Sequence, residues 1–391
     1  MLRNDCPAEF DDIRPYLDAE VPEVMDRLLS NPEMTDTILS MKFPRARHYL
    51  GWLLRPLVRR ILKRELGDIR TVRDFQELVG LHLRELLAAS HTEVTVSGIE
   101  SLDPKSAYLF ISNHRDIAMD PAFVNLVLDD HGMDTVRIAI GDNLLSKPFA
   151  TDLMRVNKSF IVRRSVSGRR EKLRALTTLS RYIRHSIMVD TACVWIAQRE
   201  GRAKDGVDRT DTALIKMLTL GKEREASFSS AVADLNMVPV SISYQFDPCD
   251  RDKARELHER RTTGSYEKKP HEDLASIYKG IAGNKGRVHV AFGDPLNRPL
   301  DDTDQVADYV DRQVISHYRL QPTNLIAWQK LHGGHPRVDA WKNAIDADWD
   351  DIELQLMARI QGEPSDVVDI FLGTYAAPVQ SLLDFGLEPL V

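Results

Sequence analysis

Cysteine is scarce in this chain of 391 residues, and long apolar runs are missing. The three cysteines, Cys6, Cys193 and Cys249, are too few and too far apart for a disulfide framework or a zinc site. We therefore expect free thiols and a reducing compartment. No stretch approaches the roughly 20 apolar residues that a membrane-spanning helix needs, so any contact with a bilayer would be peripheral. The acidic N-terminal segment lacks the apolar core of a signal peptide, so it does not predict secretion.

Acidic residues are missing from one segment, although the whole chain has a formal net charge of −7, which argues against general affinity for nucleic acid. Residues 37–64 contain no Asp or Glu but eight Lys and Arg residues. Helical spacing over residues 47–66 predicts an apolar stripe, flanked by Trp52 and Tyr49. The stripe consists of Leu50, Leu53, Leu54, Leu57, Val58, Ile61 and Leu62. It either packs on the protein's own core or, with the basic residues, binds an anionic membrane surface.

The order of patterns along the chain predicts an α/β protein. Residues 8–90 have helical periodicity, and breaks between helices are expected at Pro22, Pro32, Pro44 and Pro56. Seven β-rich segments follow, at 94–99, 107–112, 136–141, 159–164, 193–198, 238–244 and 287–292. Because they alternate with helical segments, we expect a mixed, mostly parallel sheet of about seven strands flanked by helices. Amphipathic helices are expected at 304–320 and 348–361, which gives a three-part division into 1–90, 91–300 and 301–391.

Polar residues follow the second β-rich segment, in "FISNHRDIAMDPAFVN" at 110–125. Ser112 and Asn113 are good N-cap residues, and the residues after them have helical spacing. His114 would then lie where a strand passes into a helix, at the sheet edge where α/β proteins collect ligands. A histidine beside a carboxylate can act as a general base, but it can equally be an exposed turn residue beside helix-capping aspartates. The two candidate carboxylates are Asp116 and Asp120.

Two further strand ends carry clusters of charge. "NKSFIVRRS" at 157–165 ends in Arg163 and Arg164, whose guanidinium groups could hold a phosphate or simply face solvent. "VWIAQREGRAKDG" at 194–206 runs from a buried strand into a charged turn, whose glycine allows the backbone to approach a ligand. The candidates in this turn are Glu200, Gly201, Arg202 and Lys204.

Taken in order, these segments resemble the four blocks of the glycerol-3-phosphate and 1-acylglycerol-3-phosphate acyltransferases. The blocks correspond here to residues 113–121, 160–164, 200–202 and 238–240, where the last reads Val-Pro-Val. The resemblance covers roughly residues 94–295. The family's His-x-x-x-x-Asp is one residue longer here, and its third block is one residue shorter. The "GRAKDG" at 201–206 resembles the "GRSRTG" of the glycerol-3-phosphate branch.

The resemblance implies a catalytic domain at 91–300 that moves a fatty acyl group from an acyl thioester to a hydroxyl of glycerol 3-phosphate or 1-acylglycerol 3-phosphate. His114 would deprotonate that hydroxyl, Asp120 or Asp116 would steady the imidazolium, and Arg163, Arg164 or Arg202 would anchor the phosphate. Glu200 would contact the acceptor hydroxyls. No metal or organic cofactor is implied. The donor would be acyl carrier protein or acyl-coenzyme A, at the cytoplasmic, inner face of the membrane.

Three other functions stay open on the same residues. The chain could be a lysophospholipid acyltransferase for another head group, which substrate profiling would separate. It could be a thioester hydrolase, which consumes thioester without an acceptor. It could also be a non-catalytic lipid-binding module, which would consume none.

Overall fold

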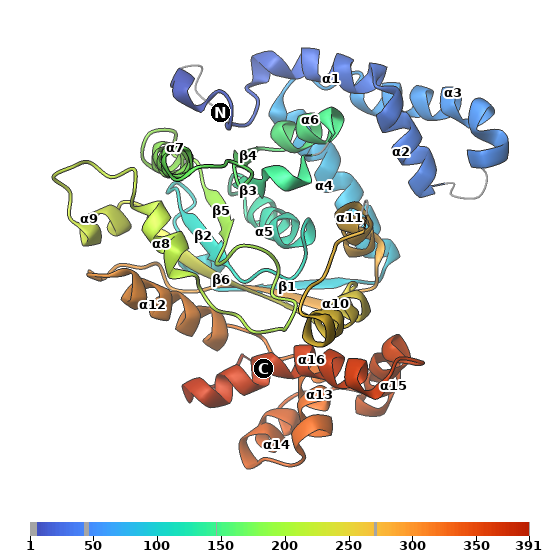
Figure 1. The fold of residues 1–391 in the computed structure, drawn as a ribbon, viewed down its shortest axis with the longest axis vertical. Coiled ribbons are helices and arrows are strands. Elements are labelled where there is room, and N and C mark those ends of the chain that lie inside the picture. Colours follow the sequence, from blue (N-terminus) through green and yellow to red (C-terminus); the bar gives the residue numbers. More distant parts are fainter. Residues whose placement is uncertain (1–5, 43–46, 146, 270–271, 391) are drawn as a thin grey trace. The chain divides into compact units, whose positions relative to one another are not determined.

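The computed structural model describes residues 6–42, 47–145, 147–269 and 272–390. They form helices and seven strands (Figure 1). The chain divides into two compact units: the first unit is residues 1–85 with 137–185, and the second unit is residues 86–136 with 186–391. Residues 137–185 therefore cluster with the N-terminal helices, and the three-part division expected from the sequence stays a prediction.

The second unit contains five strands in the spatial order β1-β7-β6-β2-β5. Their bounds are β1 Glu93–Ser97, β2 Leu109–Ser112, β5 Val194–Ala197, β6 Met237–Tyr244 and β7 Arg287–Phe292. β1 pairs with β7, and β2 with β5 and β6, in parallel, whereas β6 and β7 are antiparallel. Ser112 lies beside Ala197 and Val240. The segments that follow β2 and β5 therefore leave the sheet at the same edge.

Helices cover both faces of this sheet, as the sequence predicts. Along the chain, the following helices of the second unit come between its strands: α5 Met119–Asp130, α8 Thr212–Leu218, α9 Phe228–Ala233, α10 Asp250–Thr263 and α11 Glu272–Ala282. Consecutive strand residues point to opposite faces. The Tyr244 ring packs edge-on against Phe123 of α5, whereas Ser243 accepts a hydrogen bond of 3.1 Å from Gln321, which precedes α13.

The first unit combines N-terminal helices with a parallel strand pair. Its elements are α1 Val21–Ser30, α2 Pro32–Lys42, α3 Arg47–Leu66, β3 Arg137–Gly141, α6 Pro148–Val156 and β4 Ser159–Val162, and it shares α4 Val72–Ala89 and α7 Arg169–Met188 with the second unit. Pro22 and Pro32 stand in the first turns of α1 and α2, where a missing N–H costs nothing. Pro56 lies inside α3 and does not split it, and Pro44 falls outside the described residues. With β3 and β4, all seven predicted strands are present, and the mixed, mostly parallel α/β class is confirmed.

The C-terminal extension is helical, as predicted. It consists of α12 Thr303–Ser316, α13 Pro322–His332, α14 Pro336–Asn343, α15 Trp349–Ile360 and α16 Ser365–Phe385. Its own apolar cluster includes Trp328, Leu356 and Phe371. α16 packs against both α13 and α10. The extension is therefore part of the second unit and packs directly on α10, in the unit that carries His114.

None of the three cysteines is in a disulfide, as expected. In the part of the chain that the structure describes, no helix is long and apolar enough to pass through a bilayer.

His289 gives a prediction on stability. It is buried in β7, with Nδ1 2.8 Å from Thr95 Oγ1 and Nε2 2.9 Å from Ser97 Oγ. Burial, with a smaller contribution from Arg319, lowers the pKa of His289 to about 4. Between pH 6.5 and 4 the unfolded chain binds a proton here that the folded chain does not, so stability falls as the pH falls. We expect the wild type to lose about 2 kcal/mol more than His289→Gln between pH 7 and pH 5 in urea unfolding. Equal losses would contradict the assignment.

Candidate active site

The segment between β2 and α5 is fixed by Asn113 rather than by a helix cap. The Asn113 amide accepts a hydrogen bond of 2.8 Å from Ile242 N–H and donates one of 3.0 Å to the Ile242 carbonyl in β6. The prediction that Ser112 or Asn113 caps the next helix is wrong: α5 begins at Met119, and Asn113 is used to join two strands. The chain therefore leaves the sheet toward His114 from a residue, Asn113, that is fixed to β6 by two hydrogen bonds.

His114 and Asp120 form a hydrogen-bonded pair, with Nδ1 2.8 Å from Oδ2. The Asp120 side chain is fully buried, whereas 14% of the His114 side chain is exposed. Asp120 Oδ2 also accepts the backbone N–H groups of Arg115 (2.6 Å) and Asp116 (2.9 Å). Because Oδ2 accepts two N–H groups and is an acceptor toward the ring as well, Nδ1 carries the proton. The Nε2 lone pair is then the basic site of the ring.

Tyr244 completes the surroundings of Asp120. Its hydroxyl donates a hydrogen bond of 2.6 Å to Asp120 Oδ1. Burial, and next the charge of Asp120, raise the pKa of Tyr244 well above its ordinary value, so this hydroxyl stays protonated. Both carboxylate oxygens are thus held, and the direction from which Asp120 approaches the imidazole is fixed. Sequence reasoning missed Tyr244, because a tyrosine in a buried strand has no signal that separates it from a core residue.

Asp116 faces the start of α5. Its Oδ1 accepts hydrogen bonds from the N–H groups of Ala118 (3.0 Å) and Met119 (2.9 Å). Burial, with a contribution from Asp120, raises its pKa. A Cβ atom at Gly280 of α11 would lie 2.1 Å from Asp116 Oδ2, so only glycine lets α11 approach this closely. Asp116 therefore accepts the N–H groups at the start of α5, the capping role that the sequence assigned to Ser112 and Asn113.

The third block lies against the His114 segment. The Ala203 N–H donates to the His114 carbonyl at 2.8 Å, and the Trp195 ring of β5 packs edge-on against the imidazole with centroids 5.6 Å apart. Arg115, which is buried, donates to the Asp208 carboxylate at 2.7 Å and to the Gly206 carbonyl at 3.0 Å. The first and third blocks are thus joined by an ion pair between neighbouring loops, which the sequence did not predict.

The predicted binding residues of the third block differ from one another in burial and in pairing. Glu200 is exposed, and Gly201 has a φ of 76°, in the left-handed region that favours glycine. Arg202 is half-buried. Lys204 forms an ion pair with the buried Glu256 of α10, and its pKa is lowered mainly by burial. The Lys204 ammonium group is therefore already paired within the protein.

The arginines of the second block lie in the first unit. Arg163 Nη2 is 2.9 Å from the Asp12 carboxylate, and both side chains are exposed. Arg163 and Asp12 line a cavity of about 370 Å³ together with Glu9, Glu171 and Arg174. The Arg164 guanidinium packs over Gly141, and its backbone N–H donates to Asp142 at 3.2 Å. The structure thus brings His114, Asp116, Asp120 and the third block together in the second unit, while Arg163 and Arg164 belong to the first.

A cysteine nucleophile is disfavoured. Cys193 and Cys249 are both buried. Burial, with a contribution from Asp247, raises the pKa of the Cys249 thiol to about 11. A thiol in that state is a poor nucleophile at neutral pH.

Known proteins share this region of the chain. Residues 93–243 match the family model described as Acyltransferase. The dihydroxyacetone phosphate acyltransferase of Mus musculus is 25% identical over 210 residues, which are 52% of this chain and 29% of that protein. The Bos taurus protein of the same name is 25% identical over 214 residues, 53% of this chain and 29% of its own length. The alignments thus span less than a third of either relative.

A solved structure also aligns, that of the 1-acyl-sn-glycerophosphate (LPA) acyltransferase PlsC from Thermotoga maritima. Its TM-score is 0.35, with 14% identity over 75% of this chain and 91% of that chain.

The matched segment contains all four blocks and the hydrogen-bonded pair of His114 and Asp120. Residues 93–243 therefore form an acyltransferase domain. The match to this family model agrees, over residues 93–243, with the acyltransferase resemblance that the order of the blocks gives.

Proposed function

We propose that this protein transfers a fatty acyl group from an acyl thioester to a hydroxyl of a phosphorylated three-carbon acceptor. The observation that carries the proposal is the His114–Asp120 pair, in which Nδ1 is fixed by a buried carboxylate and Nε2 remains as a base. Glycerol 3-phosphate and 1-acylglycerol 3-phosphate are the candidate acceptors from the sequence. The name of the two mammalian relatives adds dihydroxyacetone phosphate.

In the proposed reaction Nε2 of His114 takes the proton of the acceptor hydroxyl as its oxygen attacks the thioester carbonyl. A C–O bond forms, the carbonyl oxygen gains negative charge, and the C–S bond then breaks. The proton passes from the imidazolium to the leaving thiolate, so the products are an ester and a free thiol. Asp120 stabilises the imidazolium in between. The donor thiol is that of acyl carrier protein or coenzyme A.

The proposal is tested with purified protein, palmitoyl thioester and a panel of phosphorylated and unphosphorylated glycerol acceptors. Acceptor-dependent thiol release together with acylated product supports it. Thiol release without any acceptor would show a hydrolase, and no release with any acceptor would show a binding module.

The phosphate anchor is expected among Arg163, Arg164 and Arg202. A hydrogen bond to a charged group contributes roughly 1.5–3 kcal/mol, so alanine at the anchor should raise the acceptor KM about 10–100-fold. The donor KM should not change, because the thioester end does not contact the phosphate. Steady-state kinetics of the three single variants identify the anchor. Equal effects on both KM values, or none in any variant, would contradict the anchoring role.

We also propose peripheral membrane binding through α3, on the cytoplasmic face. The residues of the predicted stripe differ in burial on this helix: Val58 is buried, whereas Leu57 and Ile61 are 52% and 45% exposed. The side chains of Leu50 and Leu53 lie outside the described residues. Arg59, Arg60, Lys63 and Arg64 are exposed beside Leu57 and Ile61, and Arg55 is paired with Asp36. An exposed apolar pair among basic residues suits an anionic lipid surface.

Liposome sedimentation tests this surface. Binding should require anionic lipid and weaken with salt, because each basic residue near such a surface contributes on the order of 1 kcal/mol. Changing Arg59, Arg60, Lys63 and Arg64 to Gln should abolish it. The matched control, Arg169, Arg170 and Lys172 to Gln on α7, should bind as the wild type does. No binding at low salt, or equal loss in both variants, would leave α3 a purely structural helix.

A further inference from the structure

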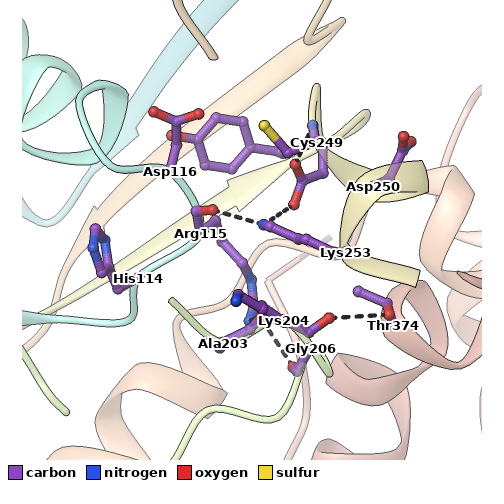
Figure 2. A network of polar contacts seen from close by, with 12 residues as sticks. His114, Arg115, Asp116, Ala203, Lys204, Gly206, Cys249, Asp250, Lys253 and Thr374 are labelled. Atoms are coloured by element: carbon purple, nitrogen blue, oxygen red, sulfur yellow. Dashed lines mark hydrogen bonds and ion pairs between the residues drawn. The ribbon is translucent and has the colours of Figure 1, made fainter. Parts of the chain in front are cut away.

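Lys253 of α10 carries a buried ammonium group close to the His114 segment. The residue is only 2% exposed. Its Nζ donates a hydrogen bond of 2.7 Å to the Arg115 carbonyl (Figure 2). The same ammonium group forms an ion pair with Asp247. A lysine is buried at this depth only when its charge and its donors are satisfied. These two partners therefore fix the position of the ammonium group.

The carbonyl that Lys253 holds belongs to the peptide group between Arg115 and Asp116. The N–H of the same peptide donates to Asp120 Oδ2 at 2.9 Å, and that oxygen is 2.8 Å from His114 Nδ1. A continuous path of hydrogen bonds therefore runs from Lys253 through one peptide group and one carboxylate to the imidazole. Donation to a peptide carbonyl polarises the peptide and strengthens its N–H as a donor.

The C-terminal helices bind Asp247, the ion-pair partner of Lys253. The Asp247 N–H donates to the Tyr375 hydroxyl of α16 at 2.9 Å, and that hydroxyl donates to Asp250 at 2.7 Å. Arg359 of α15 donates to the Asp247 carbonyl at 2.8 Å. Although burial alone would raise it, the pKa of Asp247 is lowered, because Lys253 stabilises the charged carboxylate. Asp247 is thus a charged partner whose backbone is tied to α15 and α16.

The same extension also reaches the third block. Thr374 of α16 donates to the Lys204 carbonyl at 3.2 Å, and a Cβ atom at Gly206 would lie 2.1 Å from the Thr374 carbonyl oxygen (Figure 2). Helices outside the matched segment 93–243 therefore contact both loops that surround His114.

We infer that Lys253 is a positioning residue for the His114–Asp120 pair, and that α15 and α16 hold it in place through Asp247. The inference rests on the proposed acyl transfer for its kinetic consequence. Lys253 acts through the Arg115–Asp116 peptide, which sets the position of Asp120 and so the orientation of the imidazole. The C-terminal extension is accordingly part of the frame of the active site.

The test removes the ion pair without leaving a buried unpaired charge, in the full-length double variant Lys253→Met/Asp247→Asn. We expect kcat to fall roughly 10–100-fold, the cost of a misplaced catalytic group, while both KM values stay within twofold. The low-field proton resonance of His114 Nδ1–H should shift or disappear. The matched control is Arg251→Met/Glu363→Gln, which removes a pair from the same helix, where Arg251 Nε donates to Glu363 at 2.6 Å. Its kcat and its resonance should match the wild type.

Tyr375→Phe provides a second variant that deletes one oxygen atom from α16, in case the double variant fails to fold. It should lower kcat severalfold with unchanged KM and move the same resonance. An unmoved resonance in every folded variant overturns the inference, as does an equal loss of kcat in the Arg251 control. If the wild type transfers no acyl group to any acceptor, the proposed function fails, but the resonance still decides whether Lys253 positions His114.

Discussion

Replacing His114 with alanine is expected to lower kcat about 10²–10⁴-fold, the usual cost of losing a general base. Nε2 of the imidazole keeps a lone pair that can accept the proton, whereas the Asp120 carboxylate is committed to four hydrogen bonds. Binding of both substrates should persist, so the loss belongs to kcat rather than to KM. Steady-state kinetics with the palmitoyl thioester measure it.

The fold should survive the His114→Ala change. The segment is held by its backbone, through Asn113 to β6 and through the Ala203 N–H to the His114 carbonyl, and neither contact uses the imidazole. Thermal melting should therefore change little. His131→Ala, at the far end of α5, is the matched control and should retain wild-type kcat. A His114→Ala enzyme with near-normal turnover and a normal melting curve would refute general-base catalysis by this residue.

The strands were predictable because their signal is local. Each of the seven β-rich segments contains or overlaps an observed strand, and the order of strand and helix predicts a mostly parallel sheet. The helix cap was not predictable in the same way. Ser112 and Asn113 have cap-forming side chains, but Asn113 instead bonds to Ile242, 129 residues further along the chain. The break predicted at Pro56 is also absent, because α3 runs through this residue from Arg47 to Leu66.

The site was predictable only in part. The order of the blocks identifies His114 and its two candidate carboxylates. Because one extra residue stands between the histidine and Asp-Pro, the path of the loop decides which carboxylate contacts His114, and the sequence does not predict that path. Tyr244, Lys253 and Trp195 carry no motif, because each stands in an ordinary strand or helix pattern. Their relation to His114 arises from the sheet register and from packing between distant segments, which no local pattern encodes.

The two carboxylates are expected to differ sharply when each is changed to the amide. In the wild type both oxygens of Asp120 accept hydrogen bonds, whereas the NH₂ group of Asp120→Asn can only donate. That NH₂ group must therefore either face another donor or force the imidazole into the other tautomer. A loss of roughly 10³–10⁴-fold in kcat is expected, as when the triad aspartate of a serine protease is changed to asparagine. Asp116→Asn keeps an oxygen that can accept the N–H groups of Ala118 and Met119, so α5 retains its cap and kcat should fall only a few-fold.

Paired kinetics of the two amide variants measure this difference, with thermal melting to show that both are folded. Asp116→Asn also removes a buried carboxylate, whose pKa is raised by burial and by Asp120. Because the folded chain holds this proton more tightly than the unfolded chain, the carboxylate lowers the free energy of unfolding once the pH rises above its ordinary pKa. Its melting temperature at neutral pH should accordingly be no lower than that of the wild type. Asp120→Asn has no such compensation, because it leaves the N–H groups of Arg115 and Asp116 with a poorer acceptor. A larger loss of kcat in Asp116→Asn would transfer the orienting role to Asp116, despite the 2.8 Å contact between Asp120 and His114.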